Sequence, residues 1–151
     1  MTARMKSPAT YLPEVLSPMQ ALGQAPRGHG VPDETLELVH QRVSQINGCA
    51  WCLDFGARAA RKAGMDVDKL AVLAGWPESP RFDDAERAAL ALAESVTRIA
   101  DRSDRVPDDV WDEAVRHYDE EALAALVLHI SMVNVYNRLN VTVRQVPGTF
   151  S

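Results

Sequence analysis

The sequence has little of what several common protein classes depend on. Its 151 residues include 16 Lys and Arg against 21 Asp and Glu, so the formal net charge is −5. With no run of basic residues either, this balance excludes the basic surface that nucleic-acid binding needs. The longest stretch without a formal charge, residues 122–137, is shorter than the roughly 20 residues of a membrane span. We read no signal peptide before Pro13. We therefore expect a cytoplasmic protein with no nucleic-acid or membrane partner.

Motifs for cofactors and metals are missing as well. The sequence contains no Gly-rich phosphate loop, no Gly-x-Ser-x-Gly elbow and no cluster of metal ligands, so we expect neither a cofactor nor a metal. Three of the four histidines have simple structural interpretations. His29 lies in a glycine-flanked loop that we expect to be solvated. His117 falls near a helix end that favours positive charge. His129, on an apolar helix, is typical of a hydrogen-bonded core residue.

Strand signals are scarce, and helical periodicity is widespread. No segment alternates apolar and polar residues, and β-branched residues are few before the last dozen positions. Capping residues, Pro and Gly divide the chain into six to seven helices. They are expected at about 11–22, with interruptions at Pro13 and Pro18, and at 32–46, 49–63, 66–74, 83–99 and 107–117. The last long helix is expected to begin at Asp119 or Glu120. The sequence predicts an all-α fold, with residues 1–151 forming a single domain that begins with a helix and loop over 1–30.

The last of these helices is apolar almost all round between Ala122 and Val135. A helix without a polar face must lie at the centre of the fold or in a contact between subunits. Six short neighbours cover such a helix poorly, and symmetric interfaces commonly bury what remains. We therefore expect a homo-oligomer.

The chain has only two cysteines, Cys49 and Cys52, and they lie three residues apart. Two cysteines placed at random adopt that spacing about once in a hundred times. On a helix, residues three apart share a face with Cβ atoms about 5–6 Å apart, within a small adjustment of disulfide geometry. Cysteines at helix N-termini and in Cys-x-x-Cys motifs have a pKa as low as about 3.5. The pair is thus typical of thiol–disulfide exchange.

Three other interpretations of the cysteine pair remain open but are less favoured. Two buried, inert cysteines fit the spacing poorly. Half of a zinc site is not supported, because a structural zinc needs about four ligands and the chain offers no second pair. A purely structural disulfide would close only a two-residue loop in a cytosolic chain.

Polar residues line one face of the helix that precedes the cysteines. Glu37, His40, Ser44 and Asn47 are spaced three, four and three residues apart, which places them on one strip. If the turn at Asn47-Gly48 reverses the chain, the strip runs beside the cysteine helix, with His40 level with residues 52–55 and Glu37 level with 56–59. The carboxylate and the imidazole are then candidates for a proton relay. The alternative is an ordinary first-turn acid and a half-exposed histidine.

The residues around the cysteines resemble a known family. Glu37-Leu38-Val39 followed by residues 44–54, SQINGCAWCLD, is similar to the core motif of the carboxymuconolactone decarboxylase family, in its alkylhydroperoxidase-D-like branch. Residues 61–64, 119–121 and 134–139 also fit, so the family core spans about 31–145. The resemblance implies an all-helical trimer or hexamer that reduces peroxides without a cofactor. In it Glu37, Cys49 and Cys52 are catalytic, and an external dithiol, such as a lipoyl-bearing protein, resets the pair.

One position departs from the family pattern, Cys-x-x-Cys-x-x-x-His, because residue 56 is glycine here. His40 is the nearest imidazole that could replace the missing one; alternatively, a water beside Gly56 connects Glu37 to the thiols. The sequence favours a thiol-dependent peroxidase or disulfide reductase with catalytic Cys49, Cys52, Glu37 and His40. A weakly active or non-enzymatic redox-sensing oligomer is the first alternative. A lactone decarboxylase is the second, although the family's decarboxylase branch lacks the paired cysteines.

Overall fold

Helix boundaries in the computed structural model, which describes residues 1–149, follow the capping signals of the sequence. The α-helices are α1 (Pro8–Tyr11), α2 (Pro13–Gln24), α3 (Asp33–Asn47), α4 (Ala50–Lys62), α5 (Val67–Ala71), α6 (Asp84–Thr97), α7 (Asp108–His117) and α8 (Glu120–Val143). Two 3-10 helices, η1 (Leu73–Glu78) and η2 (Ile99–Asp101), complete the described range, which contains no strand. The all-α prediction is confirmed.

Three helices begin at the aspartates that the sequence indicates. The side chain of Asp66 accepts a hydrogen bond from the Asp68 N–H, and that of Asp119 accepts one from the Ala122 N–H. Asp83 forms a complete capping box with Glu86 at the start of α6. These bonds satisfy N–H groups that a helix terminus otherwise leaves unpaired. The predicted starts of α5, α6 and α8 are therefore confirmed.

Prolines decide two boundaries, and not wholly as expected. The helix expected over 11–22 is interrupted at Pro13, as predicted, because Leu12 precedes the proline and leaves the helical region at φ −120° and ψ 77°. The second expected interruption, at Pro18, is wrong, since Pro18 lies inside α2. The connector expected at 75–80 is largely the 3-10 helix η1, which tolerates Pro77 and follows an α5 that ends at Ala71, earlier than expected.

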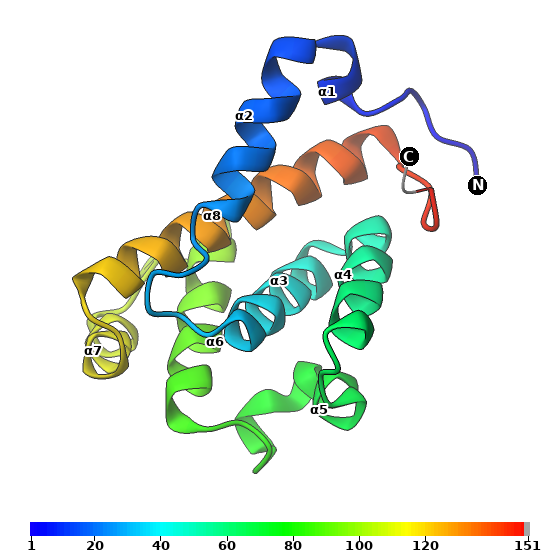
Figure 1. Ribbon diagram of the computed structural model, residues 1–151. Coiled ribbons are helices and arrows are strands. Elements are labelled where there is room, and N and C mark those ends of the chain that lie inside the picture. The colour runs from blue at the N-terminus through cyan, green and yellow to red at the C-terminus, as the bar shows by residue number, and fades with distance from the viewer. Residues whose placement is uncertain (150–151) are drawn as a thin grey trace.

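Helix α8 runs through the centre of the molecule, packed against α3, α6 and α7 (Figure 1). Its buried residues join those of the three neighbours in the main core. The largest members of that core include Leu36, Val39, Val43, Leu92, Leu126 and Ile130. Length and composition alone would let α8 cross a membrane, but 56% of its most apolar window is buried inside the fold. It is the core helix that the sequence predicts.

A second, smaller core lies between α3, α6 and η1. Leu38, Leu73, Phe82 and Leu90 are buried there, and η1 contributes Trp76 at its edge. This cluster holds the segment between α4 and α6 against the main body. The position of α3 is thus determined on two sides, by the main core and by this cluster.

Helices α1 and α2 lie on the outside of the molecule, across α8 from the other helices (Figure 1). Helix α2 has no buried residue. One of its contacts is a hydrogen bond of 2.6 Å, which the Tyr136 hydroxyl on α8 donates to the Met19 carbonyl oxygen. Its outer surface keeps Leu16 and Leu22 exposed. The first two helices are therefore bound only loosely to the rest of this chain.

Helices α3 and α4 form a hairpin side by side, as the Asn47-Gly48 signal predicts (Figure 1). Gly48 ends α3 in the left-handed region at φ 65°, where glycine is unstrained. The Cys49 N–H donates back to the Ser44 carbonyl oxygen over 3.0 Å. This tight reversal places the cysteines at the start of α4, directly beside the end of α3.

Candidate functional site: a dithiol where three helices meet

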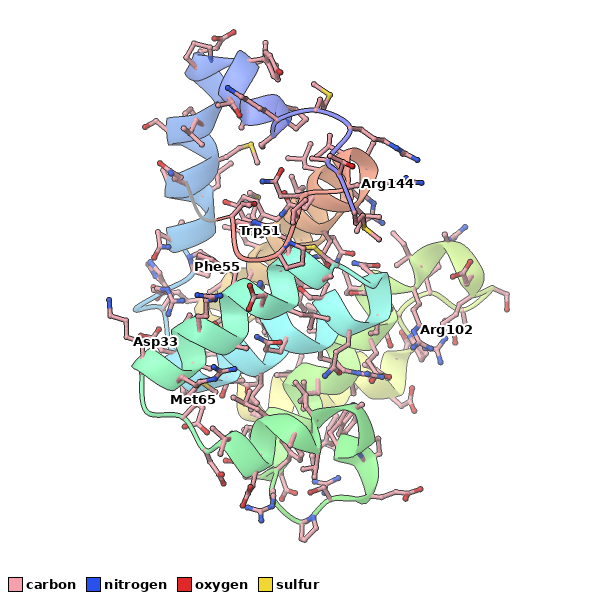
Figure 2. All side chains as sticks on the ribbon, turned by 90° about the vertical axis from the view of Figure 1, so that its right-hand side faces the viewer. Asp33, Trp51, Phe55, Met65, Arg102 and Arg144 are labelled. Atoms are coloured by element: carbon pink, nitrogen blue, oxygen red, sulfur yellow. A yellow bond between two sulfur atoms is a disulfide. The ribbon has the colours of Figure 1, made fainter. Side chains whose placement is uncertain are left out.

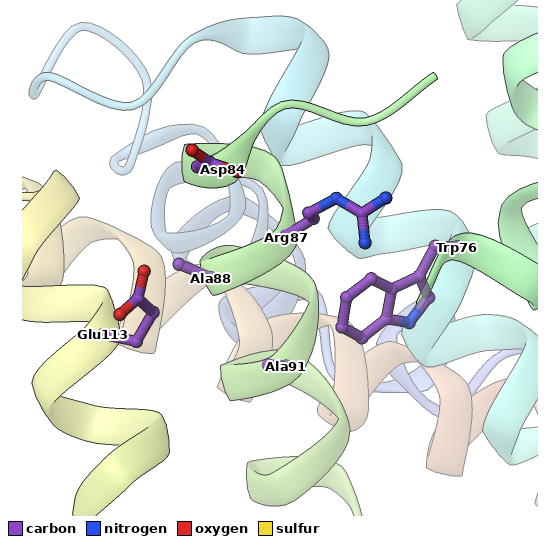
Figure 3. A pocket seen from close by; sticks show the side chains of 6 residues that line it. All are labelled: Trp76, Asp84, Arg87, Ala88, Ala91 and Glu113. Atoms are coloured by element: carbon purple, nitrogen blue, oxygen red, sulfur yellow. The ribbon is translucent and has the colours of Figure 1, made fainter. Parts of the chain in front are cut away.

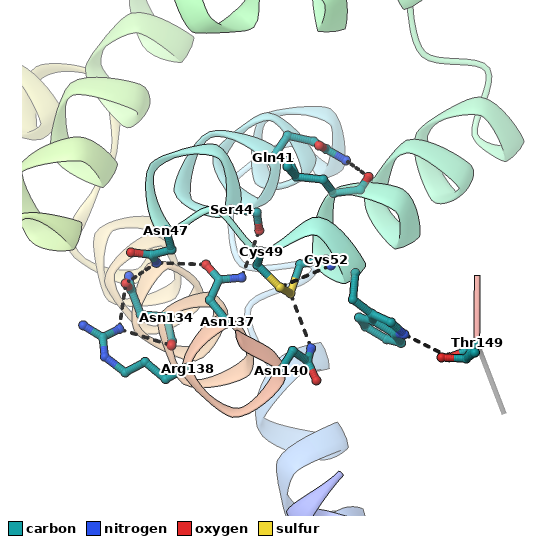
Figure 4. The surroundings of a disulfide bond; sticks show 12 residues. Gln41, Ser44, Asn47, Cys49, Cys52, Asn134, Asn137, Arg138, Asn140 and Thr149 are labelled. Atoms are coloured by element: carbon teal, nitrogen blue, oxygen red, sulfur yellow. Dashed lines mark hydrogen bonds between the residues drawn. A yellow bond between two sulfur atoms is a disulfide. The ribbon is translucent and has the colours of Figure 1, made fainter. Parts of the chain in front are cut away.

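Cys49 is the N-cap residue of α4, and Cys52 lies one turn into the same helix. Their sulfurs form a disulfide, with the Cα atoms 5.3 Å apart (Figure 4). The Cys52 N–H points at Cys49 Sγ over 3.3 Å. Each cysteine is only 1% exposed. The predicted pairing geometry and the helix-start position of Cys49 are both confirmed.

Three helices surround the disulfide. Cys49 and Cys52 come from α4, and α3 precedes them through the Gly48 turn. From α8, the Asn140 side-chain amide donates to Cys52 Sγ over 3.4 Å (Figure 4). The dithiol therefore lies at the junction of α3, α4 and α8.

Glu37 and His40 meet beside α4, as their spacing predicts. His40 Nδ1 lies 3.1 Å from Glu37 Oε1, and their side chains are only 16% and 13% exposed. Gln41 joins them: its Nε2 lies 3.4 Å from Glu37 Oε1 and 3.4 Å from the Leu53 carbonyl oxygen on α4. We call Glu37, His40 and Gln41 the α3 cluster. It is a partly buried, hydrogen-bonded group held against the cysteine helix.

Gly56 is the position on α4 that the α3 cluster faces. A Cβ atom built there would come within 2.6 Å of both Glu37 Oε1 and His40 Cε1, and it would also clash with Gln41 Nε2. The absence of a side chain at residue 56 is what allows the three tips to pack against α4. Since Gly56 follows Cys52 by four residues, it lies on the same face one turn away.

The predicted relay residues are thus near the dithiol, yet they do not touch it. Within residues 1–149, no hydrogen bond joins Glu37, His40 or Gln41 to either sulfur. The gap corresponds to about one helical turn, roughly 5.4 Å along α4. The structure brings Glu37 and His40 together as a pair and places that pair one turn from Cys52.

The other half of the polar strip on α3 faces a different helix. Asn137 of α8 donates to the Ser44 hydroxyl over 3.0 Å, and Asn47 donates to the side-chain oxygens of Asn134 and Asn137 over 2.9 Å each. The expectation that the whole strip runs along the cysteine helix is therefore wrong for Ser44 and Asn47. Near its C-terminus α3 packs against both α4 and α8, so one strip serves two neighbours.

An aromatic layer lies on the outer side of the cysteine helix (Figure 2). The rings of Trp51 and Phe55 are stacked with centroids 5.3 Å apart, and the His40 ring meets Phe55 edge-on at 6.5 Å. Trp51 Nε1 donates to the Thr149 carbonyl oxygen over 2.9 Å, which ties the C-terminal segment to this layer. Trp51 and Phe55 thus connect the cysteine turn with the α3 cluster.

The remaining histidines lie apart from the cysteines. His29 Nδ1 is 2.6 Å from Glu121 Oε1, and His117 Nε2 is 3.1 Å from Glu113 Oε1, both near the surface. His129 is buried on α8, and its Nε2 lies 2.8 Å from the Leu36 carbonyl oxygen. Burial lowers the pKa of His129 to about 4. It is the hydrogen-bonded core histidine that the sequence indicates.

Two surface hollows have volumes of about 240 and 250 Å³. The first lies beside α6, between Trp76 and Glu113 (Figure 3), and its Arg87 side chain donates to the backbone carbonyl oxygens of Pro77 and Phe82. The second lies next to α4 and α5 and includes Gln41 and Arg61. Among the described residues, no group of three or more His, Cys, Asp or Glu side chains could hold a metal ion.

Two residues of the site, Gln41 and Asn140, were not predicted from the sequence. Gln41 follows Glu37 by four residues, so the helical repeat places both on one face. Asn140 continues a three-residue spacing of asparagines that starts at Asn134 and passes through Asn137 on α8. Both signals are visible in the sequence, but only the packing of α3 and α8 against α4 connects them with the cysteines.

A helical domain with a buried cysteine pair at the start of one helix is the class of protein that this fold and site define. The profile of the carboxymuconolactone decarboxylase family matches residues 13–95. The chain belongs to that family, in agreement with the resemblance of residues 44–54.

Similar proteins support the assignment. The uncharacterized protein YdfG of Bacillus subtilis (strain 168) is 37% identical over 129 residues, which cover 85% of this chain and 86% of that one. A solved structure from Agrobacterium tumefaciens, of a protein of unknown function with a suggested AhpD role in antioxidant defence, is 28% identical. It has a TM-score of 0.89 and covers 98% of this chain and 99% of its own.

The same fold also occurs in the debrominase Bmp8, which is 21% identical. Its TM-score is 0.78, and the match covers 93% of this chain and 74% of that one. This fold therefore serves more than one chemistry, and the activity has to be argued from the site.

Proposed function

We propose that the protein is a thiol-dependent peroxidase that uses Cys49 and Cys52 as a reversible dithiol. The observation that carries the proposal is the disulfide between these two residues at the start of α4, with the α3 cluster one turn away. The family, and the suggested antioxidant role of the Agrobacterium protein, support it.

The reaction balances with two thiols and one peroxide. One cysteine, as thiolate, attacks a peroxide oxygen; the O–O bond breaks, and the products are a sulfenic acid and an alcohol, or water from hydrogen peroxide. The second thiol attacks the sulfenic sulfur, a disulfide forms and water leaves. The peroxide has gained the two electrons that the dithiol lost.

Glu37 and His40 are the groups that we propose to move protons in these steps. The thiol must lose a proton, and the departing alkoxide must gain one. Because the pair lies about one turn from Cys52, one water molecule can bridge the gap. His40 then takes over the task of the histidine that the family motif has at residue 56, and Glu37 orients it from 3.1 Å.

An external dithiol, such as a lipoyl-bearing protein, is the proposed reductant. Its thiolate attacks one sulfur of the disulfide, and a mixed disulfide then resolves to release the reduced pair. Since both cysteines are 1% exposed, this step requires the aromatic layer or the C-terminal segment over Trp51 to move.

A redox sensor is the second candidate function, and two observations favour it. The deeply buried disulfide and the glycine at residue 56 both suit a pair that oxidises slowly and is seldom reset. A sensor would react once per oxidation, without sustained turnover. The lactone decarboxylase alternative gains nothing from this site, because that reaction has no use for a dithiol.

Turnover separates the two candidates. We expect the reduced protein to consume a stoichiometric amount of peroxide, with loss of two thiols by titration and of two mass units by mass spectrometry. Added dihydrolipoamide should then sustain many cycles. Cys49→Ser and Cys52→Ser should each abolish cycling, and His117→Ala is the control with full activity. Oxidation without cycling would leave only the sensor, and intact thiols after peroxide would contradict both.

A further inference from the structure

Asn140 occupies a position that the proposed peroxidase reaction does not yet use. Its side-chain amide, from the last turn of α8, donates to Cys52 Sγ over 3.4 Å (Figure 4). The backbone carbonyl oxygen of Asn140 accepts a hydrogen bond from the Gln145 N–H over 2.9 Å, where the chain leaves α8. The end of α8 therefore holds this amide at the sulfur.

The two sulfurs receive their hydrogen bonds from different helices. Cys49 Sγ faces the Cys52 N–H at the start of α4, while Cys52 Sγ faces Asn140 of α8. A helix N-terminus stabilises a negative charge on Cys49 without help from outside α4. Cys52 lies one turn further along, so its polar partner has to come from elsewhere.

The redox state of the pair changes the strength of this bond. A sulfur in a disulfide is a weak acceptor, whereas a thiolate carries a full charge, and hydrogen bonds to charged groups are roughly twice as strong as neutral ones. Asn140 therefore stabilises the reduced, ionised Cys52 more than the disulfide.

We propose that Asn140 is a further catalytic residue of the dithiol site, which stabilises the Cys52 thiolate and favours the reduced pair. This inference rests on the proposed function only in that it assigns a use to the thiolate; the bond acts on Cys52 whether or not peroxide is the oxidant.

A single-thiol background gives a direct test. Because the chain has two cysteines, Cys49→Ser leaves Cys52 as the only thiol, and its ionisation can be followed by the ultraviolet absorbance of the thiolate against pH. In this background Asn140→Leu should move the midpoint to higher pH and lower the thiolate population near neutrality about tenfold. Asn140→Asp should move it further, because a carboxylate repels the thiolate.

Two controls isolate the amide. Asn140→Leu in a Cys52→Ser background should leave the titration of Cys49 unchanged, since Asn140 bonds to Cys52. Thr142→Ala, at an exposed position on the same helix, should change neither thiol. The acidic, basic and histidine residues of α3, α4 and α8 are unchanged in every variant, among them Glu37, His40, Asp54, Arg58 and Arg138.

The equilibrium with a reference dithiol gives a second readout in the two-cysteine chain. Asn140→Leu should shift the thiol–disulfide equilibrium constant about tenfold toward the oxidised form, equivalent to about 30 mV for a two-electron couple. Unchanged titration of Cys52 in both folded Asn140 variants would overturn the proposal. If Asn140→Leu does not fold, Asn140→Ala, which removes the amide without adding a charge, decides alone. Absence of peroxide turnover would contradict the proposed function and leave this measurement intact.

Discussion

Gly56 has a packing role at the residue scale. The space beside its backbone is filled by the tips of Glu37, His40 and Gln41. The sequence suggests that a histidine restored at this position would raise the rate if it fitted. In the structure a Cβ at residue 56 meets the ends of all three side chains, so a histidine fits there only if these flexible tips move away. Any side chain at residue 56 therefore requires the α3 cluster to rearrange.

Substitutions at Glu37 and His40 distinguish a relay through the imidazole from a direct water bridge to the carboxylate. We expect His40→Ala to slow peroxide-dependent thiol oxidation by about 100-fold, the usual scale of general acid–base catalysis. Glu37→Gln should slow it as well, because the amide neither takes a proton nor orients His40 as the carboxylate does. Stopped-flow measurement of single-turnover oxidation gives both rates.

A histidine–glutamate pair outside the site is the matched control. His117 and Glu113 of α7 lie 3.1 Å apart near the surface, so His117→Ala should leave the oxidation rate unchanged. If His40→Ala is silent while Glu37→Gln is damaging, the imidazole is not the relay and the water bridge takes its place.

At the scale of the element, α8 joins the core to the site. One part of the helix buries apolar side chains in the main core, and its asparagines bind Ser44, Asn47 and Cys52. Buried amides need partners, because an unpaired one costs about 1–3 kcal/mol. Their spacing therefore fixes how α8 lies against α3 and α4.

His129, on the same helix, makes the stability of the fold depend on pH. Burial lowers its pKa from 6.5 to about 4, so between these values the unfolded chain binds a proton that the folded chain does not. The free energy of unfolding should therefore rise with pH across this window. Conversely, His129 alone should lower the free energy of unfolding by roughly 3 kcal/mol as the pH drops from 6.5 to 4.

Urea unfolding of the wild type and of His129→Gln over that pH range measures the effect. The variant cannot titrate at residue 129. The slope of its unfolding free energy against pH should therefore be smaller, by an amount that corresponds to at most one bound proton. The other histidines remain in both proteins and cancel in the comparison. Equal slopes for the two proteins would show that folding leaves the pKa of His129 unchanged and would contradict the prediction.

At the scale of the whole molecule, the exterior of α1, α2 and α8 exposes several large apolar side chains. Helix α2 buries none of its own residues, yet a helix gains most of its stability from packing. Large exposed apolar side chains on these three helices include Tyr11, Leu16, Leu22, Val135 and Val141, and Leu12 is exposed between α1 and α2. We expect another copy of the chain to cover them in a trimer or hexamer, as large apolar patches commonly mark such contacts.

Light scattering at micromolar concentration tests this assembly. We expect a particle of several times the chain mass of 16.6 kDa, and Leu16→Glu with Leu22→Glu should reduce it. Val67→Glu places a charge at an equally exposed position on α5 and should leave the particle size unchanged. A particle of 16.6 kDa for the wild-type chain would contradict the prediction.

The sequence by itself determined the helical class, most helix starts and the cysteine pair. These features depend on local interactions: Asp83 and Asp119 cap helices through their own neighbours, Gly48 permits the reversal, and a three-residue spacing brings two thiols together on one helix. Even the meeting of Glu37 and His40 with the cysteine helix followed from helical rise and one turn, because a tight hairpin leaves a single arrangement for its two arms.

Only the tertiary structure decided which helix each polar residue faces. Ser44 and Asn47 bind α8 although they share a strip with Glu37, and Asn140 reaches Cys52 across 88 positions of sequence. The space beside Gly56 likewise exists only because α3 packs there. Contacts between segments distant in sequence depend on the packing of all the helices together, and helical periodicity specifies the face of a residue but not the neighbour that covers it.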